Sequence, residues 1–324
     1  MDINDRDRDN LTPIDGESSA QNESSQAGAV KKWFNNVWFM RIFVAIGAIS
    51  VLCVAVFTGL RFWEIHEAKK LDMDIRELFF TEETPEPNPP TDTDVMPPSL
   101  DAFLNMQNFD QLLTVNDETI GWIYIPDTNI NNVVVKGGNN KYYLSYTFYG
   151  TKSKYGTVFM DYRNALPFQD NTIIYGHNMR DDRMFGDLMK YKKAQFYNEH
   201  SIIYLKTAES VTKWKIFSVY VTSTDFYYIV NTFKNNVGLK QRFIDEVCAR
   251  SLLECDVDVT PEDKIITLST CDYTIKDGRF AVHARLLREG EDLEVNAAVQ
   301  RDPKLIEKRR NDWVEAYNEE RNAQ

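Results

Sequence analysis

The sequence predicts a mainly β domain, folded as a closed or nearly closed barrel, that follows a single membrane-spanning helix. Two observations carry this prediction. Between residues 100 and 288, many short strand-like runs alternate with turn residues, and one long helical pattern interrupts them. Upstream, residues 42–60 form a run of 19 residues without a charge. At about 1.5 Å per residue, a helix of this length reaches roughly 28 Å, close to the hydrocarbon thickness of a bilayer.

Composition narrows the classes of function. The 324 residues are 43% hydrophobic and 13% aromatic, which allows one substantial domain with appendages, or two domains. Because 49 acidic residues outnumber 37 basic ones, the net charge is -12 at pH 7. A phosphate backbone requires a basic face, so we expect no nucleic-acid partner. Four cysteines are too few for a disulfide scaffold.

The N-terminal region is predicted to be a tail followed by a membrane anchor. Residues 1–37 are mostly polar, so we expect them to be disordered. Residues 38–63 contain the uncharged run, and Trp33, Trp38 and Trp63 lie near its ends, as is typical of membrane interfaces. No small-residue cleavage site ends the run, which favours an uncleaved anchor. The alternative is a buried core helix.

Residues 64–99 are predicted to be a juxtamembrane helix and a spacer. Residues 64–80 have a helical pattern with mixed charge, and residues 81–99 contain six prolines among acids and threonines. Such a proline-rich segment is extended and holds the following domain away from the membrane. Basic residues stand on both sides of the apolar run, so the positive-inside rule does not decide the orientation.

The barrel domain is predicted to cover residues 100–288. Its strand-like runs are residues 120–126, 133–135, 156–160, 172–175, 201–205, 214–222, 264–270 and 279–287. A helix is expected over 237–253, where apolar residues recur near one face. Residues 289–324 form a charged C-terminal tail, with an exposed helix expected over 303–322. We assign this tail no function.

Strand alternation predicts that one cysteine and one arginine lie outside the barrel core. In the run that ends at Cys271, Ile266 and Leu268 share one face, whereas Ser269 and Cys271 share the other. If the apolar face fills the barrel, Cys271 points outward. In the last strand, Arg279 stands on the face opposite the apolar series. We therefore expect the thiol and the guanidinium in one external groove.

A thiol, an imidazole and a guanidinium form a set suited to acyl transfer. The thiolate is the nucleophile, and a free thiol near neutral pH is mostly protonated, so Cys271 needs a base or a cation nearby. His177, at the end of another strand-like run, can supply either, and can later protonate a leaving amine. Arg279 keeps its proton, so its expected task is to hold the substrate backbone and stabilise an oxyanion.

Other polar residues are weaker candidates for the chemistry. His283 lies four residues past Arg279, about 13 Å along a strand at roughly 3.3 Å per residue, which makes it a less suitable partner for Cys271. No CxxC or HxxxH pair is present, so we expect no metal and no cofactor. Cys248 and Cys255 are expected to be core or helix-face residues of one helical segment.

Several motifs point to one family. They are Ile120–Pro126 (IGWIYIP), Asn139–Leu144 (NNKYYL), Phe159–Asn164 (FMDYRN), Tyr175–Asn178 (YGHN), Thr267–Cys271 (TLSTC) and Asp277–Phe280 (DGRF). Together they resemble the class B sortases, the membrane-anchored cysteine transpeptidases of Gram-positive bacteria, over residues 100–288. The resemblance implies an eight-stranded barrel. It also implies that His177 is the acid/base, Cys271 the nucleophile, Arg279 the clamp and Ser269 a residue of the substrate groove.

The resemblance also implies an activity and a location. A sortase cleaves the C-terminal sorting signal of a secreted protein, commonly Asn-Pro-x-Thr-x in class B, and holds the acyl group as a thioester. It then transfers this group to an amine, usually of lipid II, the cell-wall precursor. The N-terminus would be cytoplasmic and the catalytic domain extracellular. A pilin-polymerising sortase that uses a pilin lysine, a hydrolytic cysteine protease and a membrane-tethered binding module without turnover stay open as alternatives.

Overall fold

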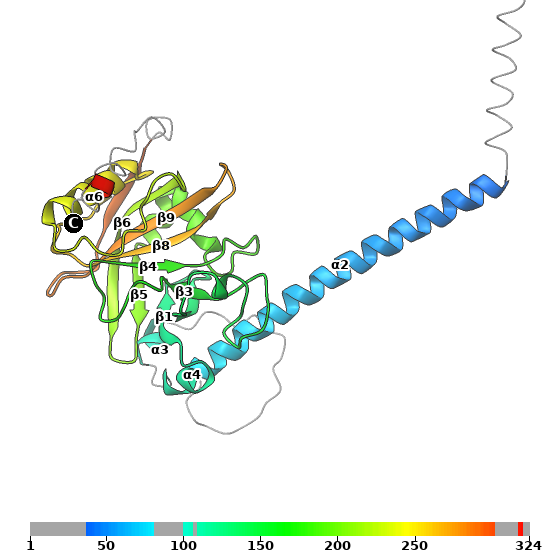
Figure 1. The fold of residues 1–324 in the computed structure, drawn as a ribbon, viewed down its shortest axis with the longest axis horizontal. Coiled ribbons are helices and arrows are strands. Elements are labelled where there is room, and N and C mark those ends of the chain that lie inside the picture. The colour runs from blue at the N-terminus through cyan, green and yellow to red at the C-terminus, as the bar shows by residue number, and fades with distance from the viewer. Residues whose placement is uncertain (1–36, 81–99, 106–108, 302–316, 320–324) are drawn as a thin grey trace, which may run out of the picture. The chain divides into compact units, whose positions relative to one another are not determined.

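The computed structural model describes residues 37–80, 100–105, 109–301 and 317–319. The chain forms two compact units, residues 1–67 and residues 68–324. Helix α2 (Val37–Phe80) contributes to both (Figure 1). The tail expected over residues 1–37 and the proline-rich spacer over 81–99 lie outside the described residues, apart from Val37 at the start of α2.

Helix α2 contains the predicted membrane anchor. Of the helices that the structure describes, it is long and apolar enough to cross a bilayer, and its apolar stretch is not buried inside the structure. Its exposed side chains include Phe43, Val51, Leu52 and Phe57. Exposure of so many apolar side chains is unfavourable in water and is expected of a lipid-facing helix. One such helix fits a single-pass membrane protein.

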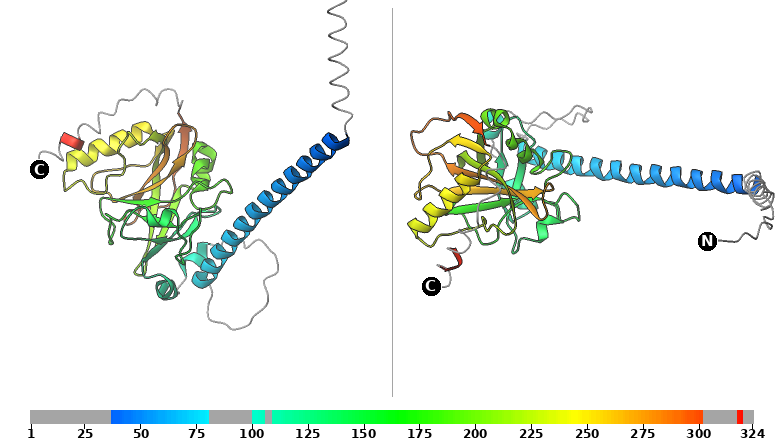
Figure 2. Two further views of the ribbon diagram at one scale, coloured as in Figure 1. Left: turned by 45° about the vertical axis from the view of Figure 1, so that its right-hand side comes forward. Right: turned by 90° about the horizontal axis from the view of Figure 1, so that it is seen from above.

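A closed β-barrel forms the body of the second unit (Figures 1 and 2). The strand order is β1-β2-β3-β4-β8-β9-β6-β5. The strands are β1 (Thr119–Tyr124), β2 (Asn131–Val135), β3 (Val158–Met160), β4 (Asn171–Tyr175), β5 (Ile202–Lys206), β6 (Val211–Ser223), β8 (Ile265–Asp272) and β9 (Gly278–Leu286). The expected eight-stranded barrel is confirmed, and each strand overlaps one of the predicted runs.

The core follows the alternation that the sequence predicts. Ile266 and Leu268 of β8 and Phe280, Val282 and Ala284 of β9 are fully buried in one cluster inside the barrel. β8 pairs with β4 in parallel and with β9 in antiparallel orientation. These three adjacent strands therefore present their outward residues side by side at the same end of the barrel.

Short helices cover the outside of the barrel. They are α3 (Leu100–Leu104), α4 (Phe109–Val115), η1 (Tyr142–Leu144), η2 (Gly186–Lys192), α5 (Ala194–Glu199) and α6 (Val237–Arg250). The last turns of α2 pack there too, because Phe79 stacks on Trp122 of β1 at 4.2 Å between ring centroids. Ile75 and Phe103 belong to the same buried cluster. Residues 68–80 are thus part of the second compact unit.

The region after residue 250 differs from the prediction. Helix α6 ends at Arg250, and Leu253–Asp256 forms strand β7, which pairs with β10 (Asn296–Gln300). Cys255 therefore lies on a strand, and the expectation that it shares a helix with Cys248 is wrong. The charged tail contains a strand that the sequence analysis missed. Of the helix expected over 303–322, the structure describes residues 317–319, which are helical.

Candidate active site

The predicted site residues lie at one end of the barrel. Cys271, near the end of β8, pairs directly with Arg279, near the start of β9. His177 follows β4 by two residues, and Tyr175, the last residue of β4, pairs with Ser269. By the same register, His177 is the counterpart of Cys271 on the parallel strand. Three adjacent strand ends thus place the backbone positions of His177, Cys271 and Arg279 side by side.

Burial along these strands places the thiol and the guanidinium at the surface. Cys271 and Arg279 are half-buried, whereas Thr270 and Phe280 beside them are buried. Ser269 also faces away from the barrel core, but only 3% of its surface is exposed. The loop between β6 and α6 covers it. Periodicity therefore predicts correctly which face Ser269 lies on, but not that a loop seals it.

Hydrogen bonds fix the backbone around the thiol. The side-chain amide of Asn178 donates to the carbonyl oxygen of Cys271 at 2.8 Å. The next residue, Asp272, is buried and accepts from Lys192 Nζ at 2.7 Å and from the backbone N–H of Thr274 at 2.7 Å. Although burial raises the pKa of Asp272, the bonds from Lys192 and Thr274 hold it below its ordinary value. Asp272 thus orders the turn between Cys271 and Arg279.

The imidazole of His177 is oriented by a backbone carbonyl. Its Nε2 lies 2.7 Å from the oxygen of Leu144. Because a carbonyl oxygen only accepts, Nε2 carries a proton, and Nδ1 of a neutral ring has its lone pair free. Gly176 precedes His177, and a Cβ atom at position 176 would lie 2.6 Å from the Phe185 ring. A larger residue there would displace the strand end that carries His177.

The guanidinium of Arg279 is held through one nitrogen. Nη1 donates to the carbonyl oxygen of Gly278 at 2.9 Å and is 3.5 Å from that of Asp277. Within the described part of the chain, no hydrogen bond engages Nε or Nη2 of Arg279. A guanidinium has five N–H groups, so Arg279 retains donors for a second molecule.

Tyr228 lies beside this set, although the sequence analysis did not single it out. Its hydroxyl is 2.7 Å from Ser269 Oγ, and the side chain is buried. Burial raises the pKa of Tyr228 to about 12, although the hydrogen bond with Ser269 and the charge of Arg279 act to lower it. Tyr228 sits in an irregular loop with no periodicity or motif, so no local signal would have found it.

The rival histidine is a core residue. His283 is fully buried, Tyr220 donates to its Nε2 at 2.8 Å, and its Nδ1 donates to Thr267 Oγ1 at 2.9 Å. The Thr267 hydroxyl donates in turn to Asn171 Oδ1 at 2.8 Å, which fixes these roles. Burial lowers the pKa of His283 to about 3. The ring is therefore neutral, satisfied and closed to substrate.

The buried imidazole makes a testable prediction about stability. The unfolded chain protonates His283 below pH 6.5, whereas the folded protein does so only near pH 3, so this residue's contribution to stability falls as the pH drops between these values. At pH 4.5 the loss is about 3 kcal/mol. We expect the stability difference between wild type and His283→Gln, measured by urea unfolding, to shrink by this amount between pH 7.5 and pH 4.5. A constant difference would contradict the assignment.

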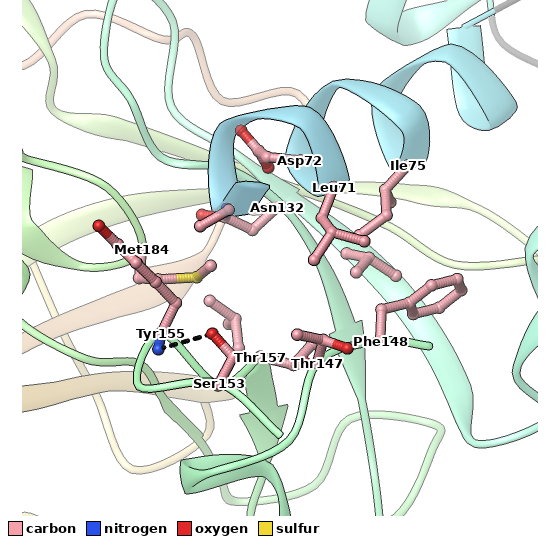
Figure 3. A pocket seen from close by; sticks show the side chains of 14 residues that line it. Leu71, Asp72, Ile75, Asn132, Thr147, Phe148, Ser153, Tyr155, Thr157 and Met184 are labelled. Carbon is pink, nitrogen blue, oxygen red and sulfur yellow. Dashed lines mark hydrogen bonds between the residues drawn. The ribbon is translucent and has the colours of Figure 1, made fainter. Parts of the chain in front are cut away.

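Cys248, Cys255 and a small cavity beside α2 lie apart from this set. Burial raises the pKa of Cys248 to about 12 and that of Cys255 to about 11, so both remain thiols. Among the described residues, no group of three His, Cys, Asp or Glu side chains is arranged to hold a metal. A cavity of about 40 Å³ lies between α2 and the segment before β3, lined by Leu71, Ile75 and Phe148 among others (Figure 3). It contains none of the predicted site residues.

The closed barrel, with Cys271, His177 and Arg279 at neighbouring strand ends, is the arrangement expected of an enzyme that transfers acyl groups through a cysteine thiol. Comparison with known proteins names the family. Residues 123–287 match the sortase domain, so the chain belongs to the sortase family, and its relatives place it in class B. Sortases are cysteine transpeptidases, which is the activity of this enzyme.

The individual similarities cover the barrel. The chain is 39% identical to Sortase B of Listeria monocytogenes over 180 residues, 54% of this chain and 72% of the relative. It is 37% identical to Sortase B of Staphylococcus aureus over 183 residues, 56% and 75% of the two chains. The solved Staphylococcus aureus sortase B–substrate complex superposes with a TM-score of 0.54 at 36% identity, over 56% of this chain and 86% of that one.

Proposed function

We propose that this enzyme cleaves the C-terminal sorting signal of secreted proteins, forms a thioester on Cys271 and transfers the acyl group to an amine of the cell-wall precursor. The observation that carries the proposal is the direct pairing of Cys271 with Arg279, next to His177. The similarity to a sortase B–substrate complex supports a peptide substrate.

In the first half-reaction the Cys271 thiolate attacks the carbonyl carbon of the scissile amide. A C–S bond forms, and the carbonyl oxygen becomes an oxyanion. As the intermediate collapses, the C–N bond breaks and protonated His177 gives its proton to the departing amine. The products are a thioester on Cys271 and the released C-terminal fragment.

In the second half-reaction an amine attacks the thioester. His177, now neutral, accepts the proton that the amine loses, a C–N bond forms and the C–S bond breaks. The thiolate of Cys271 and the protonated His177 are restored, so the cycle balances in atoms and charge. Arg279 donates its unused N–H groups to substrate carbonyl oxygens throughout, and its fixed charge stabilises the oxyanion.

The cellular setting follows from α2 and the substrate class. We propose a single-pass protein of the cell membrane, with the N-terminus cytoplasmic and the catalytic domain extracellular, where secreted proteins and lipid II are accessible. The apolar helix supports the membrane part. Use of a pilin lysine as the amine would turn the same chemistry into pilin polymerisation. In either case, Ser269 would lie beneath the groove that binds the substrate.

The fate of the acyl group tests this proposal. Full-length enzyme in detergent micelles is given a peptide with an Asn-Pro-x-Thr signal, with and without a short glycine peptide as the amine. We expect the amine to divert product from the free acid to a new amide, detected by mass spectrometry. The same glycine peptide with an acetylated N-terminus is the control and should have no effect. Unchanged hydrolysis would instead identify a protease, and absence of any cleavage a binding module.

A further inference from the structure

One buried carboxylate outside the set described above connects several parts of the site. Asp161 follows β3 and has no exposed surface. Its Oδ1 accepts from the backbone N and Nε of Arg163 at 2.9 and 2.8 Å. Its Oδ2 accepts from Arg163 Nη2 at 2.7 Å, Tyr175 OH at 2.9 Å and Asn140 Nδ2 at 2.9 Å. Five hydrogen bonds offset the desolvation of this charge.

The first connection leads to His177. Asn140 donates to Asp161 and accepts from the backbone N–H of Tyr162 at 3.0 Å, which holds its segment against the turn after β3. Four residues later, Leu144 ends η1 and presents its carbonyl oxygen to His177 Nε2. The position of this carbonyl therefore depends on a segment that Asp161 holds in place.

The second connection leads to the loop beside Cys271. Arg163 Nη1 donates to the hydroxyl of Tyr227 at 2.9 Å, and Nη2 donates to the carbonyl oxygen of Ile229 at 3.0 Å. These two residues flank Tyr228, which is hydrogen-bonded to Ser269. One guanidinium that donates to both the carboxylate and this loop holds the two together.

A third connection runs along β4. Tyr175 donates its hydroxyl to Asp161 Oδ2 at 2.9 Å and is two residues before His177. Burial raises the pKa of Tyr175 above its ordinary value, and the Asp161 charge raises it further, so the hydroxyl stays protonated as a donor. The strand end that bears the imidazole is thus tied to the same carboxylate.

We propose that Asp161 and Arg163 are positioning residues for the transpeptidase reaction: the carboxylate holds the segments beside His177 through Asn140 and Tyr175, and its arginine partner holds the loop that carries Tyr228. Within the described part of the chain, neither residue is hydrogen-bonded to the thiol, so they act by fixing the segments that carry His177 and Tyr228. The inference rests on the proposed roles of Cys271 and His177.

The chain offers a matched control at the other end of β8. Asp263 is a second buried carboxylate that accepts from an arginine through both oxygens, from Arg288 Nε at 2.9 Å and Nη2 at 2.7 Å. It also accepts from the backbone N–H and hydroxyl of Thr260. It precedes β8, whereas Cys271 lies near the end of that strand. Asp263→Asn therefore removes a comparable ion pair far from the thiol.

The test compares Asp161→Asn with Asp263→Asn in the full-length protein in detergent micelles, well below the melting temperature of each variant. We expect Asp161→Asn to lower kcat/KM for signal-peptide cleavage by about 10- to 100-fold, as misplacement of reacting groups does. Asp263→Asn should lower the melting temperature but leave kcat/KM within about twofold of wild type.

Two further variants separate the connections. Asn140→Ala releases the segment that carries Leu144, so it should lower kcat with little change in KM. Arg163→Lys keeps a charge beside Asp161 but cannot also reach Tyr227 and Ile229, so it should raise KM with little change in kcat. If Asp161→Asn does not fold, these two variants carry the test.

A readout without substrate separates this inference from the proposed function. The rate at which iodoacetamide alkylates Cys271, measured on its peptide by mass spectrometry, should fall about fivefold or more in Asp161→Asn, because a displaced His177 no longer supports the thiolate. Wild-type rates of both alkylation and cleavage in Asp161→Asn would overturn the inference, as would an equal loss in Asp263→Asn. If alkylation slows in Asp161→Asn but the wild-type enzyme does not cleave the signal peptide, the result would instead count against the proposed substrate.

Discussion

Replacement of Cys271 by alanine is expected to lower signal-peptide cleavage by at least about 10³-fold, the scale seen when a covalent nucleophile is removed. Neither of the other two thiols in the unit of residues 68–324 can substitute. Burial raises the pKa values of Cys248 and Cys255 to about 12 and 11, so neither forms a thiolate near neutral pH. Initial rates with excess enzyme, followed by separation of the peptide products, measure the effect.

Cys248→Ala is the matched control for this experiment. It removes a half-buried thiol from α6 without touching the ends of β4, β8 and β9. We expect its kcat/KM to stay within about twofold of wild type. Activity that survives in Cys271→Ala would remove the thiol from the mechanism, and the proposed thioester with it.

Substitution of Arg279 by lysine is expected to lower kcat/KM by about 10²-fold or more, the cost of losing one oxyanion-stabilising group. Lysine keeps the positive charge, but an ammonium group cannot reproduce a planar fork that is anchored to Gly278 while it donates to substrate. The melting temperature should change little, because the side chain is half-buried and forms no ion pair within the described part of the chain.

Arg288→Lys provides the comparison for the arginine. Arg288 follows β9 at the opposite end from Arg279 and pairs with Asp263 and Asp258. This substitution removes the same chemical group at a distance from Cys271 and His177, so cleavage should remain close to wild type. Near-normal rates in Arg279→Lys would show that charge alone suffices and would exclude a clamp role.

Local patterns in the sequence predict a large part of this architecture. Period-two alternation puts Ile266 and Leu268 in the core and Cys271 at the surface, and the structure agrees. The same rule correctly puts Arg279 on the outer side of β9. Alternation depends on which face of a strand is buried, so it is readable from a single strand without knowledge of its neighbours.

Features that depend on distant segments could not be predicted in this way. β7 pairs with β10, which lies about 40 residues later in the chain. Because β7 is short and closely follows α6, its sequence alone resembles a continuation of that helix. Ser269 has the outward direction that alternation predicts, but Tyr228 seals it from a loop without periodicity. The hydrogen bonds from Arg163, the partner of Asp161, to the loop around Tyr228 join segments more than 60 residues apart.

The position of the acyl group on the enzyme tests the central claim most directly. Wild-type enzyme is mixed with the signal peptide in the absence of an amine, quenched in acid, digested and examined by mass spectrometry. The account predicts an acyl adduct on the peptide that contains Cys271, which neutral hydroxylamine releases. An adduct on any other residue, or turnover that never passes through an adduct on Cys271, would contradict it.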